Sequence, residues 1–329
     1  MFNTGIDWLR KEINDLRQGR RHRRDVLKTV EEVVEIADPI IRLARRYREI
    51  LLPPVEVSIA YCNQLVNSLP GPLRLHRSAY YDDPQVKALF LSADEMDMAL
   101  QQARKFAAPE WGPEVFALLT MTKTAKTIYG HQQQGELILR DVPMQAVTFS
   151  DHRVVGAAAD LDSVKILLER RSIEILAGVA MEKIATLRAN LAELRERRER
   201  LNAMHRILSG KRRTFEIFAP SEQENAEKIY ELKALLDATD EEIITARKEL
   251  ETPDDTLGHL KKVMDLPADT IALREQLLRL NWMNVIVEGS EEAEAHQIKL
   301  VELSLKEELR RSAVLVRFDR QATSSPSGH

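Results

Sequence analysis

A seven-residue repeat of apolar side chains in the middle of the chain constrains its fold more than any other feature. Every seventh position from residue 166 to residue 208 is apolar. Such a repeat is typical of a helix that buries one seam in a left-handed supercoil, here over roughly 70 Å at about 1.5 Å per residue. The residues of this first seam are Ile166, Ile173, Ala180, Leu187, Leu194, Leu201 and Leu208.

A second apolar seam follows the helix breakers Gly210 and Pro220. Residues 161–213 carry 13 Lys and Arg against 7 Asp and Glu, whereas residues 221–251 carry 4 against 10. These opposite net charges predict an antiparallel coiled-coil hairpin over 161–251, with charges pairing across it. Because the first arm is longer, we expect its base to be buried by the rest of the chain. The residues of the second seam are Ile229, Leu232, Leu236, Thr239, Ile243, Ala246 and Leu250.

The first 126 residues predict a helical region. Asp38-Pro39 should divide the first helices and Pro53-Pro54 should end them, because proline removes an amide donor and crowds the preceding turn. Ser92 with Glu95 has the spacing of a capping box, which predicts a helix over Ala93–Phe106. The single cysteine, Cys62, lies in an apolar series with helical spacing and is interpreted as a buried structural thiol.

Short β-branched runs between Gly135 and Val155 predict a small antiparallel meander within residues 127–160. Residues 252–318 are expected to form C-terminal helices, including residues 268–282 and 290–311, with a closing edge strand over Ala313–Phe318. Residues 319–329 are expected to be a disordered tail. The predicted fold class is therefore mainly α: a long antiparallel coiled-coil hairpin on a helical body, with a small antiparallel β patch as a minor α+β component.

Motifs for bound phosphate or metal are not found. Ser209-Gly-Lys-Arg-Arg213 lacks the upstream glycine of a P-loop, and the histidines form no HxxxH pair. No cofactor or metal is therefore expected. Weak catalytic candidates are Asp141, Asp151 and His152, although Asp and His are common at turns for backbone hydrogen bonding.

Two basic clusters make nucleic acid an alternative partner, because phosphate contact needs such a density of charge. Glutamates interleave with the arginines of the hairpin, and no aromatic stacking platform accompanies them, so a salt-bridged helix surface is favoured. The residues of these clusters that would contact nucleic acid are Arg20, Arg21, Arg23, Arg24, Lys211, Arg212 and Arg213.

These features predict a non-catalytic structural or protein-interaction protein, a scaffold or adaptor, of bacterial type. Protein partners are expected and a homodimer stays open. The alternatives are a nucleic-acid-binding protein that uses the basic clusters, and an enzyme centred on the β patch at residues 127–156. No apolar stretch is long enough to span a bilayer, and a lone cysteine fits a reducing compartment, so a cytoplasmic location is expected.

Overall fold

The structure is a computed structural model that describes residues 23–108, 110–134, 137–209, 222–287 and 295–321. The chain divides into two compact units. The helical unit comprises residues 1–57 and 174–265, and the sheet unit comprises residues 58–173 and 266–329. Among the described residues, no helix combines the length and the apolar character needed to cross a membrane.

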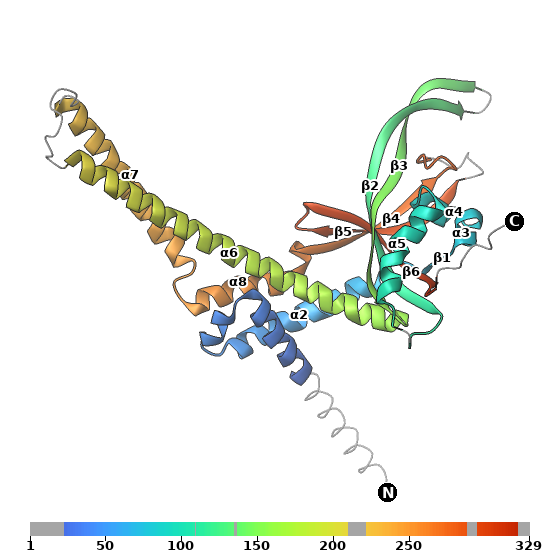
Figure 1. Cartoon of the computed structure of the whole chain (residues 1–329), viewed down its shortest axis with the longest axis horizontal. Helices are drawn as coiled ribbons and strands as arrows, with labels where there is room; N and C mark the ends of the chain where they lie inside the picture. Colours follow the sequence, from blue (N-terminus) through green and yellow to red (C-terminus); the bar gives the residue numbers. More distant parts are fainter. Residues whose placement is uncertain (1–22, 109, 135–136, 210–221, 288–294, 322–329) are drawn as a thin grey trace, which may run out of the picture. The chain divides into compact units, whose positions relative to one another are not determined.

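The sheet unit is organised on a six-stranded sheet with the order β3-β2-β6-β5-β4 (Figure 1). Neighbouring strands in this order are antiparallel, while the short β1 pairs with β6 in parallel. The strands are β1 (Leu73–Leu75), β2 (Glu114–Gln134), β3 (Leu137–Ala158), β4 (Ile271–Leu280), β5 (His296–Leu305) and β6 (Leu309–Asp319).

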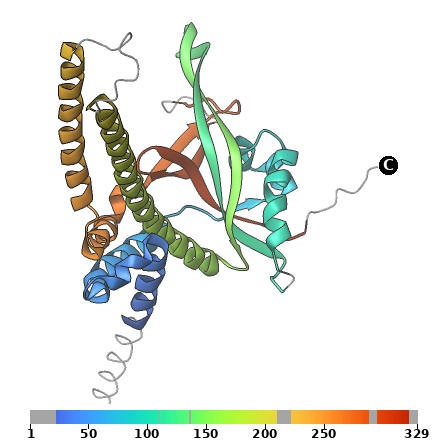
Figure 2. The ribbon, with the colours of Figure 1, turned by 60° about the vertical axis from the view of Figure 1, so that its left-hand side comes forward.

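The far halves of β2 and β3 continue as a two-stranded ribbon. Strand β6 pairs with β2 only as far as Met121, and beyond that point β2 and β3 pair with each other (Figure 2). The ribbon's Pro143 and Tyr129 lie opposite each other in this pairing. Two strands alone are marginally stable in water, so the ribbon depends on the sheet from which it extends.

Hydrogen bonds join the two ends of the sheet. The segment after β4 folds back, so that Ile286 bridges to Leu280 while Val285 bridges to Ala146 of β3. The amide of Val147 donates to the Asn284 carbonyl at 2.8 Å, and the amide of Ile286 donates to the Gln145 carbonyl at 2.8 Å. The outer edge of β3 is therefore covered at this point rather than left as an open strand edge.

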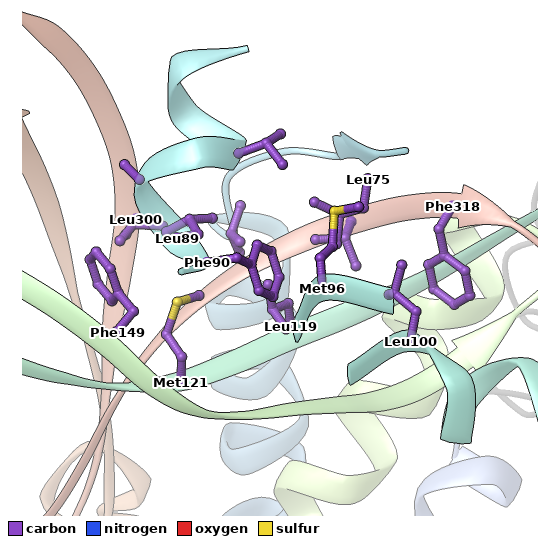
Figure 3. Close-up of a cluster of buried hydrophobic side chains, with 14 of the residues drawn as sticks. Leu75, Leu89, Phe90, Met96, Leu100, Leu119, Met121, Phe149, Leu300 and Phe318 are labelled. Atoms are coloured by element: carbon purple, nitrogen blue, oxygen red, sulfur yellow. The ribbon is translucent and has the colours of Figure 1, made fainter. Parts of the chain in front are cut away.

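One face of the sheet holds a large cluster of buried hydrophobic side chains (Figure 3). Alternate residues of β6 enter the cluster, as expected for a strand whose side chains point to opposite faces. They meet side chains from three short helices, α3 (Arg77–Asp82), α4 (Pro84–Leu89) and α5 (Ala93–Phe106). Members of the cluster include Leu75, Leu89, Phe90, Met96, Leu100, Leu119, Met121, Phe149, Leu300, Val314, Val316 and Phe318.

Residues of α2 (Tyr47–Asn67) and α6 (Leu161–Ser209) in the sheet unit are also buried. The hydroxyl of Tyr61 donates to the Ile271 carbonyl of β4 at 2.7 Å. At the base of α6, Val164 and Leu168 are buried, whereas Ile166 of the first seam is 67% exposed. Part of this base is therefore buried, as expected, but one seam residue points outward.

The helical unit contains a helix over residues 23–37, η1 (Pro39–Leu43), α7 (Glu222–Lys248) and α8 (Pro253–Asp265), with parts of α2 and α6. Asp38 divides the first helix from η1, as predicted: its carboxylate accepts from the Ile40 amide at 2.9 Å. The same buried carboxylate pairs with Arg188 of α6. Helix α8 contacts η1 within this unit.

The predicted fold class is wrong. A six-stranded sheet replaces the small meander, and β4 and β5 occupy residues that were expected to be helical. The leucine-rich residues 271–280 have high intrinsic helix propensity, but their pairing with β5 overrides it. The chain is an α+β protein organised on this sheet, not a mainly α protein organised on a coiled-coil hairpin, although more of its described residues are helical than extended.

Two smaller expectations also need correction. Pro53 and Pro54 lie inside α2 and do not end it. Ala313–Phe318 lies within a strand, as predicted, but β6 is internal to the sheet and pairs with β2 and β5. The helix over Ala93–Phe106 is confirmed with its cap, since the Glu95 amide donates to the Ser92 hydroxyl at 3.1 Å.

Candidate functional site

A β-bulge sets the position of His152. The pairing steps from Thr120 with Arg153 to Thr122 with Ser150, so two residues of β3, Asp151 and His152, lie opposite one residue of β2. Asp151 takes a left-handed φ of 51°. Such bulges redirect side chains. The bulge therefore brings the His152 ring into the core, where it stacks on Phe90 with 4.5 Å between ring centroids.

Both ring nitrogens of His152 face acceptors. Nε2 lies 2.8 Å from the Leu89 carbonyl oxygen, which can only accept, so this nitrogen carries a proton. Nδ1 lies 3.4 Å from Oε1 of Glu95, whose other oxygen accepts from the Leu91 amide at 2.7 Å. With a side chain only 3% exposed, His152 ties β3 to the start of α5.

The two other catalytic candidates have different surroundings. Asp151 binds Arg311 at 2.7 Å and Arg153 at 3.1 Å. These two guanidinium groups lower the pKa of its carboxyl group, and Arg311 has the larger effect. Asp141 is exposed on the ribbon with a left-handed φ of 59°. The geometry thus gives Asp151 and His152 separate partners, and both aspartates occupy the backbone conformation that Asp tolerates at turns.

A groove lies beside these residues, between α5 and β3. Its cavity volume is about 510 Å³, within the roughly 300–1,000 Å³ of typical ligand pockets. Small side chains line much of it, and two larger apolar ones stand exposed at its rim: Met98 at 67% and Val155 at 42%. The residues of this α5–β3 groove are Met98, Ala99, Gln102, Ala103, Trp111, His152, Arg153, Val154, Val155, Gly156 and Ala157.

The backbone at position 156, which lines this groove, requires a glycine. Its φ of 66° is one that residues with a side chain rarely adopt, and a Cβ there would lie 3.3 Å from Leu168 of α6. Glycine therefore lets β3 turn closely over α6 while leaving the groove open. The run of Gly156 and alanines was the one sequence signal for this groove. It could not predict the groove, because the other wall, α5, lies far away in the sequence.

Only some residues of the two basic clusters are among those that the structure describes. Arg20, Arg21, Lys211, Arg212 and Arg213 lie outside the described residues, while Arg23 and Arg24 are described and exposed.

Several other arginines near these clusters have acidic partners within the helical unit. Arg198 of α6 binds Asp240 of α7 at 2.6 Å, and Arg197 lies 4.0 Å from Glu242. Near the N-terminal cluster, Arg42 pairs with Glu35 at 2.7 Å. This pairing reduces the positive charge available to a phosphate backbone.

The seam residues differ in burial. Ile173, Ala180 and Leu194 are buried. Partial burial is found for Leu187, Leu201, Leu208, Ile229, Leu232, Leu236, Ile243 and Leu250.

Within the described part of the chain, no group of three or more His, Cys, Asp or Glu side chains could hold a metal ion. Cys62 is buried, as predicted, and burial raises the pKa of its thiol to about 12. A thiol that stays protonated is a poor nucleophile and a poor metal ligand.

Comparison with known proteins identifies no relative. No protein-family model, no curated protein and no solved structure matches the chain.

Proposed function

We propose that this chain is a non-catalytic protein-interaction protein that binds an apolar segment of a partner protein in the α5–β3 groove. The observation that carries the proposal is the exposed rim of Met98 and Val155 around a hollow of about 510 Å³. Exposed apolar side chains that cluster around a concave surface are typical of interaction sites, whereas single ones are ordinary.

The lining of the groove supports binding rather than catalysis. Apart from Gln102 and the indole N–H of Trp111, its polar side chains already have partners: Arg153 binds Asp151, and both ring nitrogens of His152 face acceptors in the protein. A general base must lie within hydrogen-bond reach of a substrate proton, and the side chain of His152 is only 3% exposed. His152 is better suited to fixing the groove's two walls.

The walls themselves are firmly held. Helix α5 is capped at Ser92, and Met96 and Leu100 on its inner side are fully buried in the core. In the groove, Arg153, Val154 and Val155 of strand β3 pair with β2. A preformed site loses less conformational entropy on binding than one that must be ordered first.

Affinity purification of the full-length tagged protein from its own cells, followed by mass spectrometry, tests this proposal. Val155→Glu and Met98→Glu place a charge on the apolar rim and should each reduce recovery of the partner about tenfold or more, as expected for anchor positions. Leu309→Glu is the matched control, since Leu309 is 66% exposed in the same unit but away from the groove. Equal recovery by all variants, or recovery of nucleic acid alone, would contradict the proposal.

We also propose a cytoplasmic location. The support is a single, buried and protonated thiol, which suits a reducing compartment. Cell fractionation with an antibody to the chain should find it in the cytoplasmic fraction, and recovery from the exterior or periplasm would contradict this location.

A further inference from the structure

A second hollow of the sheet unit lies between α4 and the turn that follows β4. Its cavity volume is about 140 Å³, and buried Ala88, Leu280 and Ile298 are among its lining residues. Tyr81 and Trp282 also line it, and each is 71% exposed. Aromatic residues make up only 5% of the chain, so two strongly exposed rings at one hollow need an explanation.

The turn that carries Trp282 is built rigidly. Oδ1 of Asn281, which is itself buried, accepts from the amides of Met283 and Val285, both at 3.0 Å. Asn284 has a left-handed φ of 57°, and its side-chain amide donates to the Ala88 carbonyl of α4 at 3.0 Å. The backbone of the turn is therefore fixed to α4 as well as to β3, and the exposed side chain of Trp282 extends from it.

Tyr81 is placed by its neighbour. The hydroxyl of Tyr80 donates to the Leu91 carbonyl at 2.9 Å, and the rings of Tyr80 and Tyr81 meet edge to face at 5.3 Å between centroids. Exposed Tyr and Trp on a fixed backbone offer a large contact area with few side-chain rotations to lose, which is why both are enriched at binding hot spots.

We infer that this aromatic hollow binds a proline-rich peptide segment in the polyproline II conformation. Flat aromatic surfaces pack against proline rings, and this is the general mode by which polyproline II segments are recognised. The hollow is smaller than the roughly 300–1,000 Å³ that enclose a drug-sized ligand. It fits one ring of a longer chain that lies across the exposed Tyr81 and Trp282.

The polar groups at the hollow match the same ligand. The indole N–H of Trp282 and the ammonium of Lys87 are donors only, and the Tyr81 hydroxyl can also donate. Asn281 and Asn284 line the hollow too, but Oδ1 of Asn281 already accepts two backbone amides and the Asn284 side chain already donates to Ala88. The ring of His296, which also lines it, can donate or accept. A polyproline II chain has no internal hydrogen bonds, and its proline residues have carbonyl acceptors but no N–H donors. Acceptors of the peptide therefore meet donors of the protein. This inference does not rest on the α5–β3 groove.

Fluorescence anisotropy with fluorescein-labelled decaproline and the full-length chain tests the inference. We expect saturable binding below about 1 mM, the range of weak specific complexes, and no saturation by a Gly-Ser decapeptide. Trp282→Ala and Tyr81→Ala should each weaken binding about tenfold or more. Tyr129→Ala is the matched control, because Tyr129 is a similarly exposed tyrosine of the same unit, and it should bind normally.

A further comparison separates a peptide from a small anion. Binding of neutral carbonyls should change little between low and high salt, whereas an anion held by Lys87 should dissociate as salt rises. The inference would be overturned if decaproline binding failed to saturate, or if Trp282→Ala and Tyr129→Ala bound decaproline equally. It would also be overturned if benzoate, used as the small anion, bound saturably and Lys87→Met abolished that binding. Val155→Glu should still bind decaproline, so this result and that of the groove experiment are independent.

Discussion

Strand β6 and helix α7 bury their apolar side chains to very different extents. In β6, Ala313–Val316 and Phe318 are all buried, because neighbouring strands flank this strand and residues of both sheet faces are covered. In α7, Thr239 is the one residue that is buried among those whose burial is described, and Tyr230, Leu235 and Ile244 are exposed. The regular apolar spacing in α7 therefore predicted a helix correctly, but it did not predict how far the side chains of that helix are buried.

The largest expected effect sharpens this contrast. Phe318→Ala should lower the free energy of unfolding by about 3–5 kcal/mol, because it leaves a cavity in the core. Leu235→Ala on α7 should change it by about 0.5 kcal/mol or less, since Leu235 is 45% exposed. Urea unfolding followed by circular dichroism measures both. An equal loss of unfolding free energy in the two variants would contradict this difference between β6 and α7.

The helical unit is expected to depend on one buried polar contact. Asp38→Ala removes the acceptor of the Ile40 amide and the partner of Arg188, and should cost about 1–3 kcal/mol in unfolding free energy. Glu35→Ala, which removes an exposed partner of Arg42, is the control and should cost much less. Thermal unfolding of both variants checks this, and similar melting temperatures would count against a special role of Asp38.

The cap of α5 should contribute a smaller amount. Ser92→Ala removes the hydroxyl that accepts from the Glu95 amide, and should cost about 1 kcal/mol. Ser92→Gly should cost only a few tenths of that, because glycine is tolerated at this position. If urea unfolding shows the glycine variant to be the less stable one, the cap is not what positions α5.

The ion pairs between α6 and α7 should contribute least. Arg198→Ala is expected to cost about 0.2–1 kcal/mol, because the side chains of Arg198 and Asp240 are about half-exposed, and the cost should fall with added salt. Arg195→Ala, at an exposed position of the same helix, serves as the control. A loss above that of Asp38→Ala would mean that this helix pair is more strongly coupled than its exposure suggests.

The protonated state of Cys62 gives a prediction on pH. Burial raises the pKa of its thiol to about 12, above the roughly 8.5 of a free thiol, and the Glu169 carboxylate acts in the same direction. The folded chain therefore keeps the proton: this contribution to stability is complete below the free-thiol pKa and is lost as pH rises toward 12. Iodoacetamide at pH 8 should label the chain in urea but not in buffer, and equal rates would contradict the burial.

Most local signals predicted local structure correctly, although Pro53-Pro54 did not end a helix. The Ser92 and Glu95 spacing, the Asp38-Pro39 break and the apolar series around Cys62 all depend on residues a few positions apart. The strands β4 and β5 were missed because their sequences suit helices, and only pairing with distant residues makes them strands. Even so, Ile298 and Leu300 alternate as a strand requires, and this signal could have been found.

The candidate site was predicted only in part. The sequence singled out His152, but its partners Leu89 and Glu95 come from another part of the chain, so its contacts could not be foreseen. The α5–β3 groove is formed by small residues on two distant elements, and a hollow leaves no periodic pattern in a sequence. Tyr81 and Trp282 likewise line one hollow although they lie far apart in the sequence, so this hollow could not be predicted either.

Site-specific photo-crosslinking tests the central claim, that a partner protein occupies the α5–β3 groove, most directly. A benzophenone amino acid would replace Met98 in one variant and Leu309 in another, two positions that are 67% and 66% exposed in the same unit. After irradiation in the protein's own cells, we expect the variant with the label at position 98 to crosslink to a discrete partner protein. The variant with the label at position 309 should give no crosslink to that protein. Crosslinking of the same proteins from both positions, or of none from position 98, would contradict the claim.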